Sequence, residues 1–169
     1  QAVVEGEAML AVSELMNYDF LAHVQYESGL SKKQFKKLFE YGEGMKFVKA
    51  IRENGGWEAV GRLYLEPPKS TSTILNPQRY LSGMDSLQTL SKTINLRRGE
   101  ELIEVESKGG YGWMLYLAPT SPNRIHLLNQ LYKEDEFIVL TRDGKLYYRW
   151  RVGFASIAAA KKAEVFLQP

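Results

Sequence analysis

The chain has 169 residues, of which 44% are hydrophobic and 25% are charged, and its formal net charge is +2. This composition is typical of a globular domain and excludes extended disorder, while the length suffices for one full core or for two small lobes that share an interface. The near-neutral charge gives no support for a nucleic-acid partner, and the lack of cysteine excludes disulfides and thiolate metal sites. No apolar run approaches the roughly 20 residues of a membrane-spanning helix, so no transmembrane segment is expected.

Residues 2–22 are predicted to form an amphipathic helix. Glu5 lies on the flank of its apolar stripe, whereas Glu7 points away and is expected to be solvated. A carboxylate half directed at a core needs a hydrogen-bond donor, a cation or a metal. A solvated Glu5, stabilised by the positive end of the helix dipole, is the alternative. The stripe expected to face the core consists of Val4, Ala8, Ala11, Val12 and Leu15.

A second helix begins after Ser31, which forms a Ser-x-x-Gln capping box with Gln34. It runs to about residue 42, with lysines on its solvent-exposed face and Phe35 on its buried face. A third helix follows and is expected to end at Gly55-Gly56 in a left-handed cap.

A short fourth helix over residues 57–64 is stopped by Pro67-Pro68. Ser70 then caps one further turn of helix, which Asn76-Pro77 closes. The chain is therefore expected to be nearly all helical as far as residue 82, and residues 82–92 are expected to connect across the surface.

The remaining residues mix strands and helices. Residues 111–118 fit either a strand or a turn of buried helix. On the last strand Tyr148 and Trp150 are expected to pack inside, with Tyr147, Arg149 and Arg151 facing water. The other expected elements are a strand at 102–106, a helix from Pro122 to Leu131, a strand at 137–140, a hairpin turn at Asp143-Gly144, a strand at 147–152 and a helix at 158–167.

These elements predict an α+β fold: a mainly helical part over 1–82 and a small mixed β-α-β-β-α lobe over 83–169, packed as one compact unit.

The chain has only two histidines, His23 and His126, about a hundred residues apart, so no pair of imidazoles lies on one helix. A local hydrogen-bonded pair of His23 with Glu27 and a packed His126 are the expected roles. Glycine-rich phosphate loops and Gly-x-Ser-x-Gly elbows are absent from the sequence, which leaves nucleotide binding and serine-hydrolase chemistry without local support.

One long pattern resembles a known family. It begins with Tyr41-Gly42-Glu43-Gly44-Met45-Lys46-Phe47-Val48 and continues through Gly55, Gly56, Trp57, Tyr64, Pro67, Pro68, Ser70, Thr71, Leu75, Pro77 and Tyr80. In these residues the chain resembles poorly characterised prokaryotic zinc-metallopeptidase-like proteins of the gluzincin type. In that family a helix with His-Glu-x-x-His precedes a helix that begins Ala-Leu-Val-Glu-Gly-Asp/Glu-Ala, and residues 2–8 are similar to the latter.

The resemblance implies that Glu5 is the third zinc ligand, with two imidazoles and a general-base Glu before residue 1. Zinc is then expected only in the full-length protein, and this chain alone has no catalytic residues. The family also reads Ser-Thr-Glu-Gln-x-Leu-His-Pro where this chain has Ser72 and Asn76 in place of the Glu and the His, which implies weakened or absent catalysis.

Residues 146–156, followed by an Ala-rich helix, are similar to the later half of SPOR-type domains, which bind peptidoglycan glycan strands. This second likeness implies a different role, a non-enzymatic cell-envelope module whose C-terminal lobe binds a glycan or protein partner. Either resemblance favours a cell-envelope or secreted location and a peptide or envelope partner.

Overall fold

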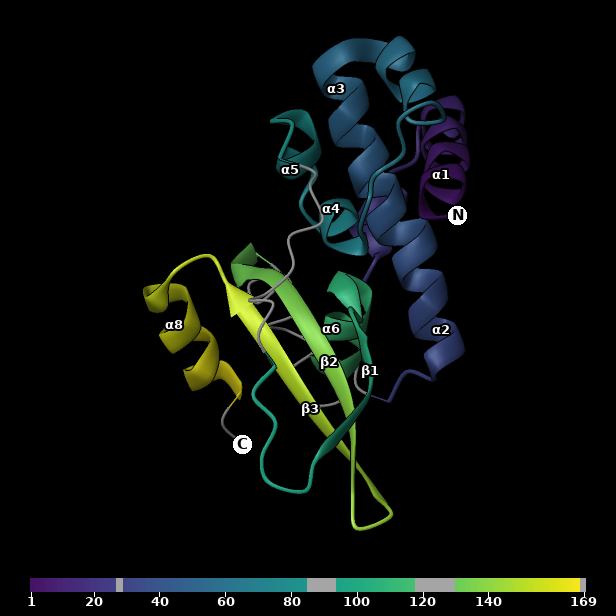
Figure 1. Ribbon diagram of the computed structural model, residues 1–169. Coiled ribbons are helices and arrows are strands. Elements are labelled where there is room, and N and C mark those ends of the chain that lie inside the picture. Colours follow the sequence, from purple (N-terminus) through teal and green to yellow (C-terminus); the bar gives the residue numbers. More distant parts are fainter. Residues whose placement is uncertain (27–28, 85–93, 118–129, 168–169) are drawn as a thin grey trace.

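The computed structural model describes residues 1–26, 29–84, 94–117 and 130–167 and has the expected α+β architecture (Figure 1). The first half is helical. Its elements are α1 (Ala2–Met16), η1 (Phe20–His23), α2 (Lys32–Lys37), η2 (Leu38–Glu43), α3 (Gly44–Arg62), α4 (Thr71–Leu75) and α5 (Pro77–Leu81). The second half follows the expected β-α-β-β-α order, with β1 (Glu101–Glu106), α6 (Gly109–Leu117), β2 (Tyr132–Arg142), β3 (Lys145–Phe154) and α8 (Ile157–Leu167).

The elements with strong local signals form as predicted. Ser31 and Gln34 make both hydrogen bonds of the capping box at the start of α2. Ser70 accepts a hydrogen bond from the backbone N–H of Thr73 and caps α4. Asp143 and Gly144 have φ values of 51° and 70°, as a two-residue hairpin turn requires. Of the ambiguous stretch 111–118, residues 111–117 belong to a helix, α6.

The second and third predicted helices form one continuous run, because a π-helical segment, η2, joins α2 to α3. Gly55 and Gly56 break the helical geometry inside α3, with φ of −151° and 67°. The predicted break between the third and fourth helices at these glycines is confirmed, but it is not a left-handed cap, since ψ of Gly56 is −171° and the chain resumes a helix at once. The glycines therefore form a kink in α3.

The first helix differs from its prediction in length and in the face that it buries. It ends at Met16, because Asn17 adopts the left-handed conformation, and residues 20–23 form a separate 3₁₀ turn. The expected stripe faces outward, and Leu15 is 87% exposed. Instead Gly6 and Leu10 are buried. Both sides of the helix are apolar, so periodicity alone does not select the buried one.

The three strands form one antiparallel sheet in the order β1-β2-β3. The helix α6 packs against β2, and α8 lies along β3 (Figure 1). The prediction for β3 is wrong at Tyr148, which is 63% exposed, whereas Trp150 packs against Trp113 of α6.

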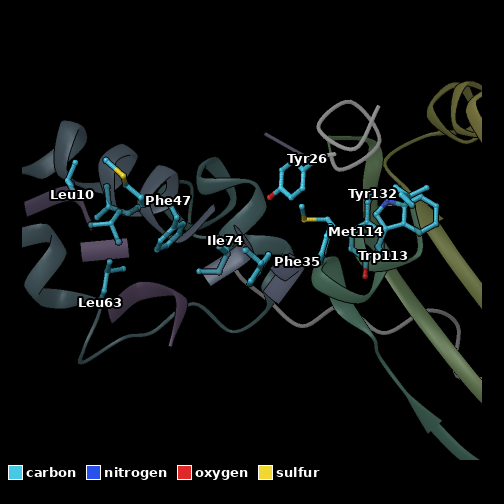
Figure 2. Packing of buried hydrophobic residues seen from close by; sticks show 14 of the residues in the cluster. Leu10, Tyr26, Phe35, Phe47, Leu63, Ile74, Trp113, Met114 and Tyr132 are labelled. Atoms are coloured by element: carbon cyan, nitrogen blue, oxygen red, sulfur yellow. The ribbon is translucent and has the colours of Figure 1, made fainter. Parts of the chain in front are cut away.

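One cluster of buried side chains runs through both halves of the chain. Figure 2 shows it extending from Leu10 and Leu63 on the helical side, past Phe35, to Trp113 and Tyr132 beside the sheet. The sheet lobe and the helices thus share buried contacts.

Some expectations lie outside the described residues. These are most of the connection expected over 82–92, most of the helix expected from Pro122 to Leu131, His126, and Glu27 as the partner of His23. Within the described ranges, no helix combines the length and apolarity needed to span a membrane.

Candidate functional site

A cavity of about 560 Å³ lies where the first turn of α1 meets the segment that follows α3. Its walls are mainly apolar, with a few polar side chains among them, which is the usual composition of a ligand-binding pocket. The lining residues are Gln1, Ala2, Val3 and Val4 from the chain start, Lys36, Phe39 and Glu40 from α2 and η2, Leu63, Tyr64, Pro67, Pro68, Lys69, Ser70, Thr71 and Ile74, and Tyr111 from α6.

The residues that carry the family resemblance divide between this cavity and its surroundings. Five of them line it, namely Tyr64, Pro67, Pro68, Ser70 and Thr71. Gly55 and Tyr80 line a neighbouring cavity of about 770 Å³, which shares Pro67 and Lys69 as a common wall. Gly56, Trp57 and Pro77 line neither of these two cavities, and Trp57 instead lies under the guanidinium group of Arg52.

Hydrogen bonds hold the common wall in place. The hydroxyl of Tyr80 donates to the backbone carbonyl of Glu66 at 2.6 Å. Thr71 Oγ1 accepts from the backbone N–H of Tyr111 at 3.1 Å, which joins the wall to α6. The ring of Pro67 also fixes its φ angle. These motif residues therefore shape the cavity.

Glu7 has a partner, contrary to the sequence prediction. The hydroxyl of Tyr64 donates a hydrogen bond to its carboxylate, and this bond raises the pKa of Tyr64. The bond ties α1 to the end of α3, from which the cavity wall continues. Glu7 is half-buried, so its role as a purely solvated residue is corrected.

Glu5 is half-buried beside the cavity and does not belong to its lining. The Tyr41 hydroxyl faces this carboxylate, and the interaction with Glu5 raises the pKa of Tyr41. The amide of Gln1 lies 3.4 Å away. Within the described part of the chain no group of three His, Cys, Asp or Glu side chains is placed to hold a metal ion. The residues present thus offer one carboxylate ligand and do not by themselves fit zinc.

A second polar centre, which the sequence did not reveal, surrounds Asp135 of β2. Its buried carboxylate accepts hydrogen bonds from the hydroxyls of Tyr132 and Ser107, at 2.6 and 2.7 Å, and from the indole of Trp150 at 2.6 Å. The backbone N–H groups of Lys108 and Gly109, both at 3.0 Å, complete the set. Burial raises the pKa of Asp135, but these donors outweigh it and hold the pKa below its ordinary value.

The geometry gives Asp135 a structural role. Its carboxylate meets the exposed backbone N–H groups at the start of α6, as an N-cap residue does, although it comes from a strand 26 residues away. The acidic run around Asp135 resembles the solvated face of a strand, so only the tertiary structure identifies the buried member.

Glu43 is another buried carboxylate. The hydroxyl of Tyr26 donates to its Oε1 at 2.7 Å, and Lys46 Nζ lies 2.8 Å from the same atom. Burial, followed by the nearby carboxylate, raises the pKa of Tyr26 far above its ordinary value. The carboxylate of the motif residue Glu43 therefore has both a hydrogen-bond donor and a cation as partners inside the helical core.

Comparison of this chain with protein families, with curated proteins and with solved structures finds no match.

Proposed function

We propose that this chain is the C-terminal part of a zinc-metallopeptidase-like protein or pseudo-peptidase, inactive on its own. In the proposal Glu5 supplies one zinc ligand, and a preceding segment supplies His-Glu-x-x-His. The observation that carries it is the convergence of Tyr64 and the 67–71 segment with the first turn of α1 around one apolar cavity. Separate parts of the motif thereby meet beside the helix of Glu5.

Two further observations support the role of Glu5. Carboxylates that bind metals commonly have an outer hydrogen-bonding partner, and the Tyr41 hydroxyl, whose pKa is raised by its interaction with Glu5, is the candidate for that partner. The outward face of α1, with Val4, Val12 and Leu15, is apolar and exposed. In the proposal the segment bearing His-Glu-x-x-His packs against this face.

Metal analysis of the gene's complete product tests the proposal. We expect one zinc ion per molecule, lost on substitution Glu5→Ala and kept in Glu7→Gln, which removes a neighbouring charge bonded to Tyr64. A pseudo-peptidase that binds zinc gives the same metal content without peptide hydrolysis. If the complete product has no His-Glu-x-x-His before Gln1, or if zinc stays bound in Glu5→Ala, the proposal fails.

The second candidate is a non-enzymatic envelope module whose C-terminal lobe binds a partner. The exposed side chains of the sheet and of α6 favour it, since Leu146, Tyr148 and Tyr116 are each more than half exposed. Co-sedimentation of the chain with peptidoglycan, compared with Tyr148→Ala, tests its glycan-binding form. Retention that depends on Tyr148 supports this candidate.

A further inference from the structure

The strand β1 forms an open edge of the sheet. It pairs with β2 on one side, and no described strand pairs with its other side (Figure 1). All six of its residues are exposed. An edge strand presents unpaired backbone N–H and C=O groups, which are the groups that an added strand binds.

A β-bulge places the acidic side chains of β1 on one face of the sheet and Leu102 and Val105 on the other. Glu101, Glu104 and Glu106 lie opposite Thr141, Val139 and Phe137 of β2, which alternate along that strand and so share one face. Leu102 and Val105 lie opposite Leu140 and Ile138 on the other face. The register shift between Leu102 and Glu104 produces this separation. Without it, Leu102 and Glu104 would share a face.

Two of the three glutamates on the acidic face of β1 can form an ion pair with a partner. Glu106 forms an ion pair with Lys108, whereas Glu101 and Glu104 are exposed and have no ion pair within the described residues. The apolar row on the opposite face is also open, with Leu102 43% and Val105 42% exposed. The edge therefore offers carboxylates on one face and aliphatic side chains on the other.

A second copy of this chain is a poor partner for this edge. Antiparallel pairing of β1 with β1 of another copy places both acidic rows on one face of the joined sheet. Like charges on neighbouring strands destabilise the pairing. A strand with cations on that face gains favourable cross-strand contacts.

We propose that the free edge of β1 binds an extended segment of another protein as a fourth strand, and that lysine or arginine alternates with aliphatic residues in this segment. The cations lie beside Glu101 and Glu104, and the aliphatic side chains lie beside Leu102 and Val105. This inference names the partner class for the second candidate function. It is independent of the cavity and of zinc.

A peptide that alternates lysine and valine is the probe, and fluorescence anisotropy measures its binding to the purified chain. We expect slower hydrogen exchange of the backbone amides of residues 101–106 in the complex. The double substitution Glu101→Lys and Glu104→Lys is expected to weaken binding by about tenfold or more, because attraction becomes repulsion at two positions. The same variant is expected to bind a peptide that alternates glutamate and valine.

Two controls separate the proposal from simple charge attraction. The double substitution Glu53→Lys and Glu164→Lys makes the same change in net charge at exposed sites outside the sheet and is expected to leave binding unchanged. A peptide with the same lysines and valines in two separate blocks is expected to bind weakly. Equal binding of both peptides, equal loss in both variants, or self-association through β1 overturns the proposal. Binding of peptidoglycan glycan alone overturns it but leaves the second candidate function in place.

Discussion

Gly6 and Gly44 bring α1 into backbone contact with the start of α3. A Cβ atom added to Gly6 would overlap the carbonyl group of Gly44, and one added to Gly44 would overlap the carbonyl oxygen of Ala2. Both residues are buried. The two helices therefore approach to a distance that only glycine permits.

Substitution Gly6→Ala is expected to lower the free energy of unfolding by about 2–3 kcal/mol, because the added methyl group forces two backbones apart. Urea denaturation followed by circular dichroism measures this change. Gly61→Ala is the matched control, since Gly61 also lies in a helix and a Cβ there meets nothing within 4 Å. It is expected to stabilise the fold by up to about 1 kcal/mol. Equal unfolding midpoints for wild type and Gly6→Ala would contradict the close contact.

Substitution Asp135→Asn is expected to lower the free energy of unfolding by about 3 kcal/mol, because the amide group turns one acceptor of this buried side chain into a donor that faces five other donors. Urea denaturation again gives the value. Asp143→Asn removes the same charge in the hairpin turn, where the left-handed backbone favours Asn-Gly. This control is expected to change stability by less than about 0.5 kcal/mol. Similar losses in both variants would exclude the structural role of Asp135.

The stability contributed by Asp135 is expected to depend on pH. The pKa of Asp135 in the folded state lies below its ordinary value of 3.8, so the ionised form stabilises the fold above that value. The contribution is lost as pH falls through the folded-state pKa. The difference in stability between wild type and Asp135→Asn is therefore expected to be largest near neutral pH and to shrink below about pH 4. Urea midpoints measured from pH 7 to pH 3 test this, and a constant difference would be inconsistent with a lowered pKa.

Elements whose sequence pattern spans only a few neighbouring residues were predictable from the sequence. The capping box of Ser31 and Gln34 and the turn at Asp143-Gly144 are examples, because the residues that make the structure are neighbours in the chain. The α+β class followed from the order of such elements. The buried face of α1 was not predictable, since apolar residues lie on both sides and the choice depends on Gly44, 38 residues after Gly6.

The candidate site was predictable only in part. The motif singled out Tyr64 and the 67–71 segment, which do line one cavity. The interaction of Tyr41 with Glu5 and the hydrogen bond from Tyr64 to Glu7 join distant parts of the chain, so no local pattern indicates them. The exposure of Tyr148 was also not predictable. The alternation of side chains along a strand shows which residues share a face, but it does not show which face another element covers.

The 560 Å³ cavity is expected to bind the aromatic rings of the anionic dye anilinonaphthalene sulfonate, and substitution Val4→Trp is expected to reduce the dye fluorescence several-fold. Val4 lines the cavity and is 52% exposed, so a larger ring there fills the mouth without disturbing the core. Val12→Trp is the matched control, because Val12 lies on the same outward face of α1, is 41% exposed and does not line the cavity. It is expected to leave the fluorescence unchanged. An equal reduction in both variants would place the dye on the outward face of α1 and would remove the cavity as a ligand site.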